Sequence, residues 1–339
     1  MDPMRAVHSS GALLVSMSGG SFACSTMTIA IATTVLYPTT SFITWLDYHL
    51  QRVELVLIYM DDITQRPIFE VLCGDRPVLL FEGASDAPSM SPSSRTILRQ
   101  SNNLKHAIAH LLAHGTTWLL HIDIDEILWE NGDTNWSLQP NTGCVTFTNH
   151  EAVPPRLGTD RPFHDCVWFK VNGCKPGTQL PFMAYGNGKS AVRLRPGVAP
   201  DGPHSFQGYN GKHITMPGEG GPVLLHYPCV SFEAWAAKFK QYGDFSDFWF
   251  DDPDKPNYIQ FMLLSRDHVK KALESGDWKP ARAFYESMTI DDEACQRAVS
   301  SGQIRRYAPF EKDSRYDTKR EATISSDIEP MITVSHLCS

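Results

Sequence analysis

The feature that most constrains the fold is an alternation of short apolar runs with helix-like segments in the first part of the chain. The apolar runs lie at residues 26–32, 53–59, 77–81 and 117–122. The segments between them place apolar residues at helical spacing, at 42–50, 67–73 and 101–114. A strand buried on both faces is a near-continuous apolar run. The alternation therefore predicts an α/β fold with a mostly parallel, Rossmann-like sheet flanked by helices.

The second part of the chain is less regular and predicts a β-rich region with long loops. Gly and Pro are frequent at 154–161 and 186–221. Helix-like segments return at 232–242 and 258–274. We expect three regions along the chain: a flexible leader at 1–23, one folded domain at 24–285, and a C-terminal helix with a mobile tail at 286–339.

An uncharged stretch near the N-terminus raises the question of a membrane anchor. No charged side chain occurs between Ser9 and Leu46, and residues 22–37 are largely apolar. A membrane-spanning helix needs about 20 predominantly apolar residues. Glycine, serine and threonine interrupt this run and Pro38 ends it, which favours a buried strand over a signal peptide or anchor. Membrane association is therefore disfavoured rather than excluded, and both a Golgi or secretory location and a cytoplasmic one agree with the sequence.

The charge balance argues against nucleic acid as a partner. The chain has 30 basic and 38 acidic side chains, a formal net charge of -8, and no basic run of useful length. Nucleic-acid-binding proteins usually have a basic patch or stripe. The eight cysteines include no C-x-x-C pair, which argues against a structural zinc site.

Two aspartates follow the last apolar run of the alternating region. Asp123 and Asp125 flank Ile124. On a strand, alternate side chains point the same way, so both carboxylates would converge at the edge of the sheet where ligands bind. Mg²⁺ and Mn²⁺ prefer such oxygen ligands and leave positions for substrate phosphates. The pattern predicts a divalent-cation site, and two solvent-facing aspartates at a strand end are the alternative.

A histidine further along the chain could add a nitrogen ligand to this site. His226 ends another apolar run, and a neutral imidazole can join an ion held by carboxylates. A hydrogen-bonded core histidine is the alternative. His106, His110 and His114 also recur at every fourth residue, but on the face opposite the apolar residues of their helix. We expect these three to form a solvent-exposed stripe rather than a metal site.

Several segments resemble GT-A glycosyltransferases related to families 2 and 92. The most specific is W-L-L-H-I-D-I-D-E-I-L at 118–128, close to that group's W-L-L-H-I-D-x-D-E-F-L. Other matching pieces occur in the group's order: F-I-T-W-L-D-Y-H at 42–49, Y-M-D-D at 59–62, Arg99, Gln100 and Asn103, Gly188 and Lys189 with Arg195 and His204, and L-H-Y at 225–227 with S-F-E-A-W at 231–235 and Lys238. Thr44 departs from the group, where an acidic residue is usual.

The resemblance implies a GT-A fold and a metal-dependent transfer from a nucleotide-sugar, with a UDP-sugar favoured, to a glycan, protein or small-molecule acceptor. It places Mn²⁺ or Mg²⁺ on Asp123, Asp125 and His226. The residues that it places at the donor are Asp61, Asp62, Arg99, Asn103, Lys189 and Arg195. An inverting transfer also needs a base for the acceptor hydroxyl, for which the candidates are Glu151 first, then Asp244 and Asp247.

Two other functions stay open at this stage. A phosphatase of the haloacid dehalogenase type also ends a buried strand with D-x-D. However, Ile127 stands where that class normally has Thr or Val, and the motif follows several strands rather than the first one. A non-catalytic protein that binds nucleotide-sugars or carbohydrate would keep the same residues, so that only turnover separates it from an enzyme.

Overall fold

The computed structural model describes residues 28–39, 41–84, 92–130, 136–171, 185–216, 221–289 and 291–311. The expected leader at 1–23 and the tail beyond 311 lie outside the described residues. The expectation of a mobile tail therefore stays a prediction.

The central sheet has seven strands in the order β12-β6-β9-β4-β1-β2-β3. Their bounds are β1 (Ile29–Val35), β2 (Leu55–Met60), β3 (Val78–Glu82), β4 (Trp118–His121), β6 (Thr142–Phe147), β9 (Lys189–Arg193) and β12 (Lys212–Met216). Strand β1 runs parallel to β2 and β4, β2 to β3, and β12 to β6, whereas β9 is antiparallel to both β4 and β6. The predicted mixed α/β fold with a mostly parallel sheet is confirmed.

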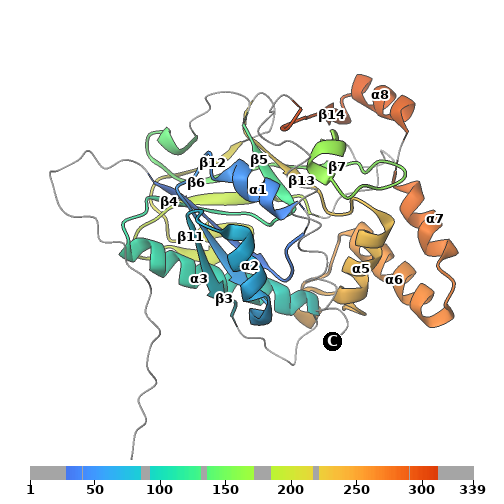
Figure 1. Cartoon of the computed structure of the whole chain (residues 1–339), viewed down its shortest axis with the longest axis horizontal. Coiled ribbons are helices and arrows are strands. Elements are labelled where there is room, and N and C mark those ends of the chain that lie inside the picture. The colour runs from blue at the N-terminus through green and yellow to red at the C-terminus, as the bar shows by residue number, and fades with distance from the viewer. Residues whose placement is uncertain are drawn as a thin grey trace, which may run out of the picture.

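Helices cover both faces of this sheet (Figure 1). Helices α1 (Phe42–His49) and α2 (Arg66–Cys73) lie on one face, and α3 (Pro92–Ala113) lies on the other. The side chains of β2 explain the layering, because Val56 and Ile58 pack in the core with α1 and α2 while Leu57 and Tyr59 pack with α3. This is the alternation expected of a strand buried on both faces.

Helix α3 is longer than its apolar periodicity predicts. The expected start at 101 is wrong, since the helix begins at Pro92. A proline is tolerated in the first turn of a helix, where its missing N–H would have no partner.

A second sheet packs against the first, with the order β14-β8-β7-β13-β5. Its strands are β5 (Glu126–Trp129), β7 (Asn149–Ala152), β8 (Trp168–Lys170), β13 (Val223–His226) and β14 (Ile304–Arg306). Strand β14 pairs with β8, so the region after 285 contributes to this sheet. The expected boundary at 285 falls inside α7 (Lys279–Ser287).

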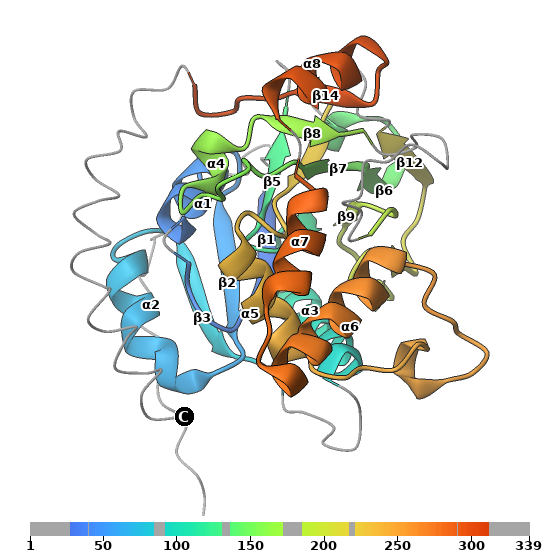
Figure 2. The same cartoon turned by 90° about the vertical axis from the view of Figure 1, so that its right-hand side faces the viewer.

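Further helices form a layer beside the two sheets (Figure 2). Helices α5 (Phe232–Tyr242), α6 (Gln260–Ser275) and α7 share an apolar core built around Trp235, Phe239 and Tyr285. The smaller elements are α4 (Pro162–Asp165), α8 (Asp292–Ser300), β10 (Ala199–Asp201), β11 (Ser205–Gln207), η1 (Ile63–Gln65), η2 (Trp136–Leu138) and η3 (Trp249–Asp251). Among the helices of the described residues, none combines the length and the apolar character that crossing a membrane requires.

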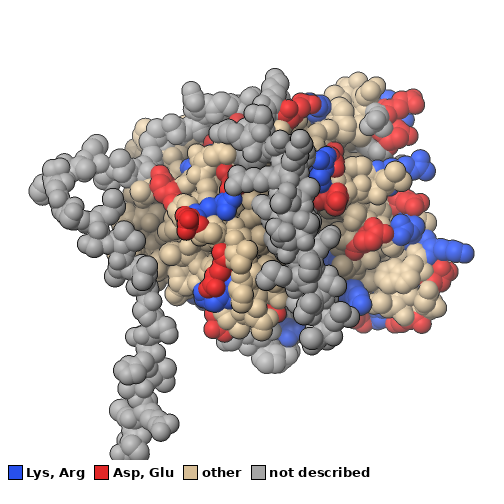
Figure 3. Space-filling view, in the orientation of Figure 1, with Lys and Arg blue, Asp and Glu red and all other residues tan. Residues whose placement is uncertain are grey.

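Acidic and basic side chains are interspersed on the face of the molecule shown in Figure 3. Oppositely charged side chains also form pairs, as in Arg76–Asp47, where Nε and Oδ1 are 2.6 Å apart.

Buried polar contacts fasten α1 to β5. The Trp45 indole donates to the carbonyl of Glu126 at 2.8 Å. The His49 ring lies between two backbone groups: Nδ1 donates to the Trp45 carbonyl at 2.9 Å, and Nε2 accepts from the Leu128 N–H at 3.4 Å. Because Nε2 must keep a lone pair for that bond, the ring is neutral. Burial agrees with this, since it lowers the pKa of His49 to about 3.

This histidine should make stability depend on pH. Its folded pKa of about 3 lies below the ordinary value of 6.5, so its contribution is present above pH 6.5 and is lost as the pH falls. Between pH 7.5 and pH 5.5 the loss should be about 1.4 kcal/mol. Urea unfolding measures the free energy of unfolding at both pH values. Its decrease from pH 7.5 to pH 5.5 should be smaller in His49→Gln than in wild type by about that amount. His114→Gln, at an exposed position, is the control. If the free energy of unfolding changes equally with pH in wild type and His49→Gln, His49 is not the neutral, buried histidine described above.

Candidate functional site

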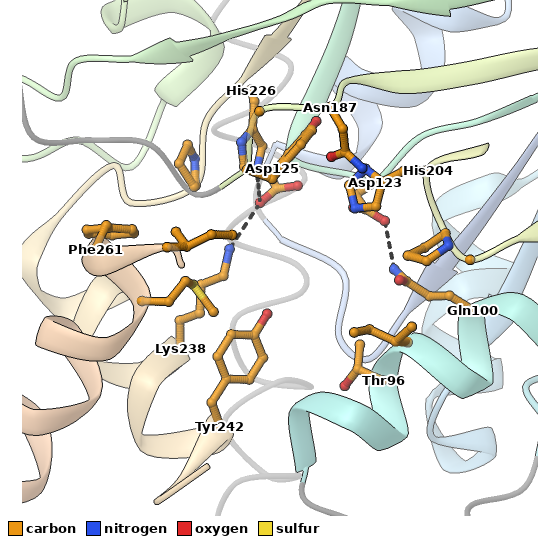
Figure 4. Close-up of a pocket in the computed structure, with 18 of the residues that line it drawn as sticks. Thr96, Gln100, Asp123, Asp125, Asn187, His204, His226, Lys238, Tyr242 and Phe261 are labelled. Atoms are coloured by element: carbon orange, nitrogen blue, oxygen red, sulfur yellow. Dashed lines mark hydrogen bonds and ion pairs between the residues drawn. The ribbon is translucent and has the colours of Figure 1, made fainter. Parts of the chain in front are cut away.

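The two aspartates of the D-x-D segment lie in a turn, not on a strand as predicted. Residues 122–125 connect β4 of the central sheet to β5 of the second sheet, and the Glu126 N–H closes the turn on the Asp123 carbonyl at 3.1 Å. Ile122 is buried in the core. Asp123 and Asp125 still line one cavity, of about 580 Å³, at the carboxyl end of β4 (Figure 4). The predicted convergence of the two side chains on one space is therefore present, but the turn produces it.

Asp123 is held by a buried lysine and a glutamine. Lys189, the first residue of β9, is 1% exposed, and its Nζ lies 2.6 Å from Asp123 Oδ2. Gln100 on α3 donates to Asp123 Oδ1 at 3.0 Å. Gly188 permits the approach of β9 to β6, since its φ is +67° and a Cβ there would lie 2.1 Å from the Phe147 carbonyl oxygen. The lysine is thereby fixed at the base of the cavity.

Asp125 faces a histidine and a second lysine. His226, at the end of β13, places Nε2 3.6 Å from Asp125 Oδ2, and Lys238 on α5 places Nζ at 3.6 Å from the same oxygen. The other nitrogen of His226, Nδ1, lies 2.9 Å from Oε2 of Glu151, which is 1% exposed. Burial would lower the pKa of His226, but Glu151 and Asp125 raise it to about 10. Glu151 therefore orients the ring from behind, while Nε2 faces Asp125.

Two further residues support the site, Tyr185 in the cavity lining and Glu126 fully buried beside Asp123, and neither was among the predicted site residues. Glu126 is fully buried, accepts from the Asp123 N–H at 2.7 Å, and accepts a hydrogen bond from the Tyr185 hydroxyl. Its Oε2 lies 3.8 Å from Lys189 Nζ. Burial raises the pKa of Glu126 to about 7, an effect that Lys189 opposes. Burial alone would also raise the pKa of Asp123, but Lys189 helps to hold that pKa below its usual value.

The predicted donor residues near β2 form a separate cluster, outside the lining of this cavity. Asp61 Oδ2 lies 3.0 Å from Arg99 Nη2. Asn103 donates to Thr34 Oγ1 at 2.9 Å and accepts from the Ala84 N–H at 2.7 Å, so it ties α3 to the ends of β1 and β3. Asp62 caps η1. Helix α3 belongs to both places, because it carries Arg99 and Asn103 of this cluster and also Gln100, which lines the cavity.

The structure does not bring Arg195 to the site. Strand β9 runs antiparallel to β4, so its first residue, Lys189, reaches the cavity and its end lies at the opposite edge of the sheet. There the Leu194 N–H donates to the Thr117 carbonyl, just before β4 begins. Arg195 therefore lies at the wrong edge to neutralise phosphate in this cavity.

The three predicted candidates for the catalytic base do not line the cavity. Glu151 is buried behind His226. Asp244 and Asp247 are exposed and pair with α6, Asp244 with Lys270 at 2.5 Å and Asp247 with Arg266 at 2.7 Å. Lys270 lowers the pKa of Asp244 through a hydrogen bond. These placements do not favour contact of the three carboxylates with an acceptor in the cavity.

The histidine stripe on α3 lies at the surface, as expected, but it is packed rather than freely solvated. His106 and His114 are exposed and His110 is half-buried. The rings of His106 and His110 contact Phe81 at centroid distances of 4.9 and 5.3 Å. Within the described ranges no group of three or more His, Cys, Asp or Glu side chains is arranged to hold a metal ion unaided.

Two curated proteins of Arabidopsis thaliana, both named glycosyltransferase-like, are similar to this sequence. One is 28% identical over 156 residues, which cover 40% of this chain and 30% of the relative. The other is 29% identical over 238 residues, which cover 63% of this chain and 51% of the relative. The matched segments thus span between about a third and a half of these relatives. The chain is related to glycosyltransferase-like proteins.

Comparisons with family models and with solved structures do not assign the chain to a family or to a fold. No family model matches the sequence. A solved structure, mannose-1-phosphate geranyltransferase from Thermus thermophilus, is 11% identical and aligns over 78% of this chain and 70% of its own, with a TM-score of 0.24. A TM-score this low gives no support to a shared fold.

Lys189 should be essential for stability, because it is a buried charge set between two carboxylates. Replacing it in Lys189→Met leaves Asp123 and Glu126 without their cation, and breaking such a pair costs about 3–5 kcal/mol. The matched control is Lys270→Met, which removes an exposed pair with Asp244 and should leave stability almost unchanged. Urea unfolding of both variants measures the difference. Similar small effects at both positions would contradict the role given to Lys189.

Proposed function

We propose that this chain is a glycosyltransferase of the GT-A type that transfers a sugar from a nucleotide-sugar, with a UDP-sugar favoured, and that uses Mn²⁺ or Mg²⁺. The observation that supports it most is the pairing of Asp123 and Asp125 in one turn, where the chain leaves the parallel sheet. Ligands bind at this edge of open α/β sheets. The relation to glycosyltransferase-like proteins points to the same class of reaction.

The residues around Asp125 fit a divalent cation that takes the place of the proton on His226, because an imidazole binds a metal only in its neutral form. The His226 nitrogen that faces Asp125 is backed by a buried carboxylate at 2.9 Å, the arrangement that usually fixes the orientation of a metal-binding histidine. One imidazole and one or two carboxylates make an incomplete ligand set. Mg²⁺ is commonly held by one or two carboxylates, with substrate phosphates and water filling the remaining positions. When bound, the ion would neutralise negative charge on the leaving diphosphate.

The two lysines would supply the rest of the positive charge. Lys189 and Lys238 approach Asp123 and Asp125 from opposite sides of the cavity, one from β9 and one from α5. Lys189 is 1% exposed and Lys238 is half-buried, so water screens both ammonium groups less than it screens a surface lysine, and each can hold a phosphate oxygen more strongly. Their role would be to bind and orient the diphosphate of the donor.

The net reaction follows from this placement of charge. The oxygen of an acceptor hydroxyl forms a bond to the anomeric carbon, and the bond from that carbon to the phosphate oxygen breaks. The nucleoside diphosphate leaves with the electron pair, and the hydroxyl proton ends in solvent. Positive charge preorganised at the leaving group favours this step, because it stabilises charge that develops in the transition state.

The proposal predicts nucleotide binding that depends on both the metal and Asp125. Thermal unfolding would be followed with UDP, GDP and CMP, each with and without Mn²⁺, for wild type and Asp125→Asn. A ligand at about 100 times its Kd stabilises the folded state by about 2.7 kcal/mol. We expect UDP to stabilise wild type only with Mn²⁺, and Asp125→Asn to lose the effect. Asp244→Asn, an exposed carboxylate away from the cavity, is the control and should behave as wild type.

Other outcomes of this measurement would favour one of the two alternative functions, a phosphatase or a binding protein. Stabilisation by metal or inorganic phosphate alone, with none by any nucleotide, would overturn the proposal and favour a phosphatase. Metal-dependent UDP binding without consumption of any UDP-sugar would identify a binding protein that lacks turnover.

Glu151 acts in this proposal as a positioning residue for His226 instead of as the base. Glu151→Gln should then raise the Mn²⁺ concentration needed for half-maximal UDP stabilisation by about 10- to 100-fold, the usual effect of losing such a carboxylate. Asp247→Asn is the matched control. An unchanged Mn²⁺ requirement with a large loss of turnover would instead favour the base role first expected of Glu151.

A further inference from the structure

The cavity has two walls of different chemistry. One carries the charged groups around Asp123, Asp125 and His226. The other, which we call the apolar wall, comes from α5, η3 and α6 and consists of Phe239, Tyr242, Trp249, Phe250, Phe261 and Met262. Figure 4 shows Phe261 and Tyr242 on this helical side, away from Asp123 and Gln100. In the proposed function, only the charged wall binds the donor and the metal.

The apolar wall rests on a rigid foundation. Phe239, Phe261 and Met262 are 1%, 6% and 9% exposed and belong to the core of the helical layer. Phe239 makes edge-to-face contacts with Phe261 and with Tyr242, at centroid distances of 5.7 and 5.9 Å. Interlocked aromatic pairs of this kind hold their geometry. The wall is therefore preformed.

A strained turn adds two more aromatic side chains to the wall. Phe250 has φ +59° and ψ +23°, a left-handed conformation that is uncommon for a bulky residue. The turn is held by hydrogen bonds from the Phe250 N–H to Ser94 Oγ at 3.1 Å and from the Trp249 N–H to the Lys255 carbonyl at 2.8 Å. Trp249 and Phe250 are half-buried and face the cavity. Strain of this kind persists mainly at functional sites.

The wall lies next to the charged groups. Lys238, which pairs with Asp125, and Tyr242 are four residues apart on α5, so they share one face of that helix. A molecule lying on the wall would thus reach toward Asp125 at one end. This is where the acceptor hydroxyl must be for transfer.

The wall provides little hydrogen bonding. Of its six side chains, only those of Tyr242 and Trp249 have an oxygen or nitrogen atom. A sugar lying there would leave several hydroxyls without partners, and each unpaired buried polar group costs about 1–3 kcal/mol. A flat apolar ring has no such hydroxyls to leave unpaired and would gain the burial of its surface.

We propose that the acceptor is a hydroxylated apolar molecule, an aromatic or alicyclic ring system that lies on the apolar wall with its hydroxyl toward Asp125. This inference rests on the proposed function and specifies the acceptor that the transferase would use.

The test measures binding of 2-naphthol, with glucose and N-acetylglucosamine as polar counterparts, to protein saturated with UDP and Mn²⁺. We expect calorimetry to detect 2-naphthol and not the sugars. Trp249→Ala and Tyr242→Ala, from two different elements, should each weaken 2-naphthol binding by about tenfold, equivalent to the loss of one aromatic contact. Phe248→Ala is the matched control, because Phe248 lies beside Trp249, is 38% exposed and does not line the cavity.

UDP binding in the same variants separates the two proposals. Unchanged UDP binding with weakened 2-naphthol binding supports the inference and also shows that the variants are folded. If Trp249→Ala and Tyr242→Ala weaken UDP instead, the wall holds the nucleobase and the inference is overturned while the transferase stands. If the sugars bind and 2-naphthol does not, the inference is likewise overturned. If UDP and Mn²⁺ do not bind wild type, the proposed function itself has failed.

Discussion

The buried ion pair between Lys189 and Asp123 is the interaction on which the rest of the site depends. It lies where the chain leaves the parallel sheet for the second sheet, and it joins β9 to the turn between β4 and β5. Glu126 continues the network on the second sheet through Lys189 and the Asp123 N–H. The position of Asp123 is therefore fixed by charges buried between the two sheets, because a buried charge without a partner is very costly.

The sequence was a good guide to the central sheet, for a local reason. Continuous apolar runs and helical spacing are properties of neighbouring residues, so they can be recognised without knowledge of the fold. The start of α3 was missed because a proline in the first turn looks the same in sequence as a proline in a loop. The convergence of Asp123 and Asp125 was predicted for the wrong reason, since a tight turn and a strand can both direct two alternate side chains to one side.

The parts of the site that sequence did not reveal depend on long-range geometry. Arg195 was expected beside Lys189, but the reversed direction of β9 carries it to the far edge of the sheet. Glu151 was expected to act as the catalytic base, and its pairing with His226 follows from the register of β7 with β13. Lys238 belonged to a matching segment, yet its proximity to Asp125 requires the packing of α5 against the turn. Strand direction, register and helix docking are not local properties.

The two walls of the cavity come from different stretches of the chain. The charged wall is gathered from α3, the D-x-D turn, β9, β13 and Lys238 of α5, whereas the apolar wall lies within the single stretch 239–262. Changes within this one contiguous segment could therefore alter which acceptor is modified, while the charged residues that bind the donor stay unchanged. Such modularity would let related genes diversify their products without rebuilding the catalyst, and a graft of this segment alone would be the natural unit for engineering.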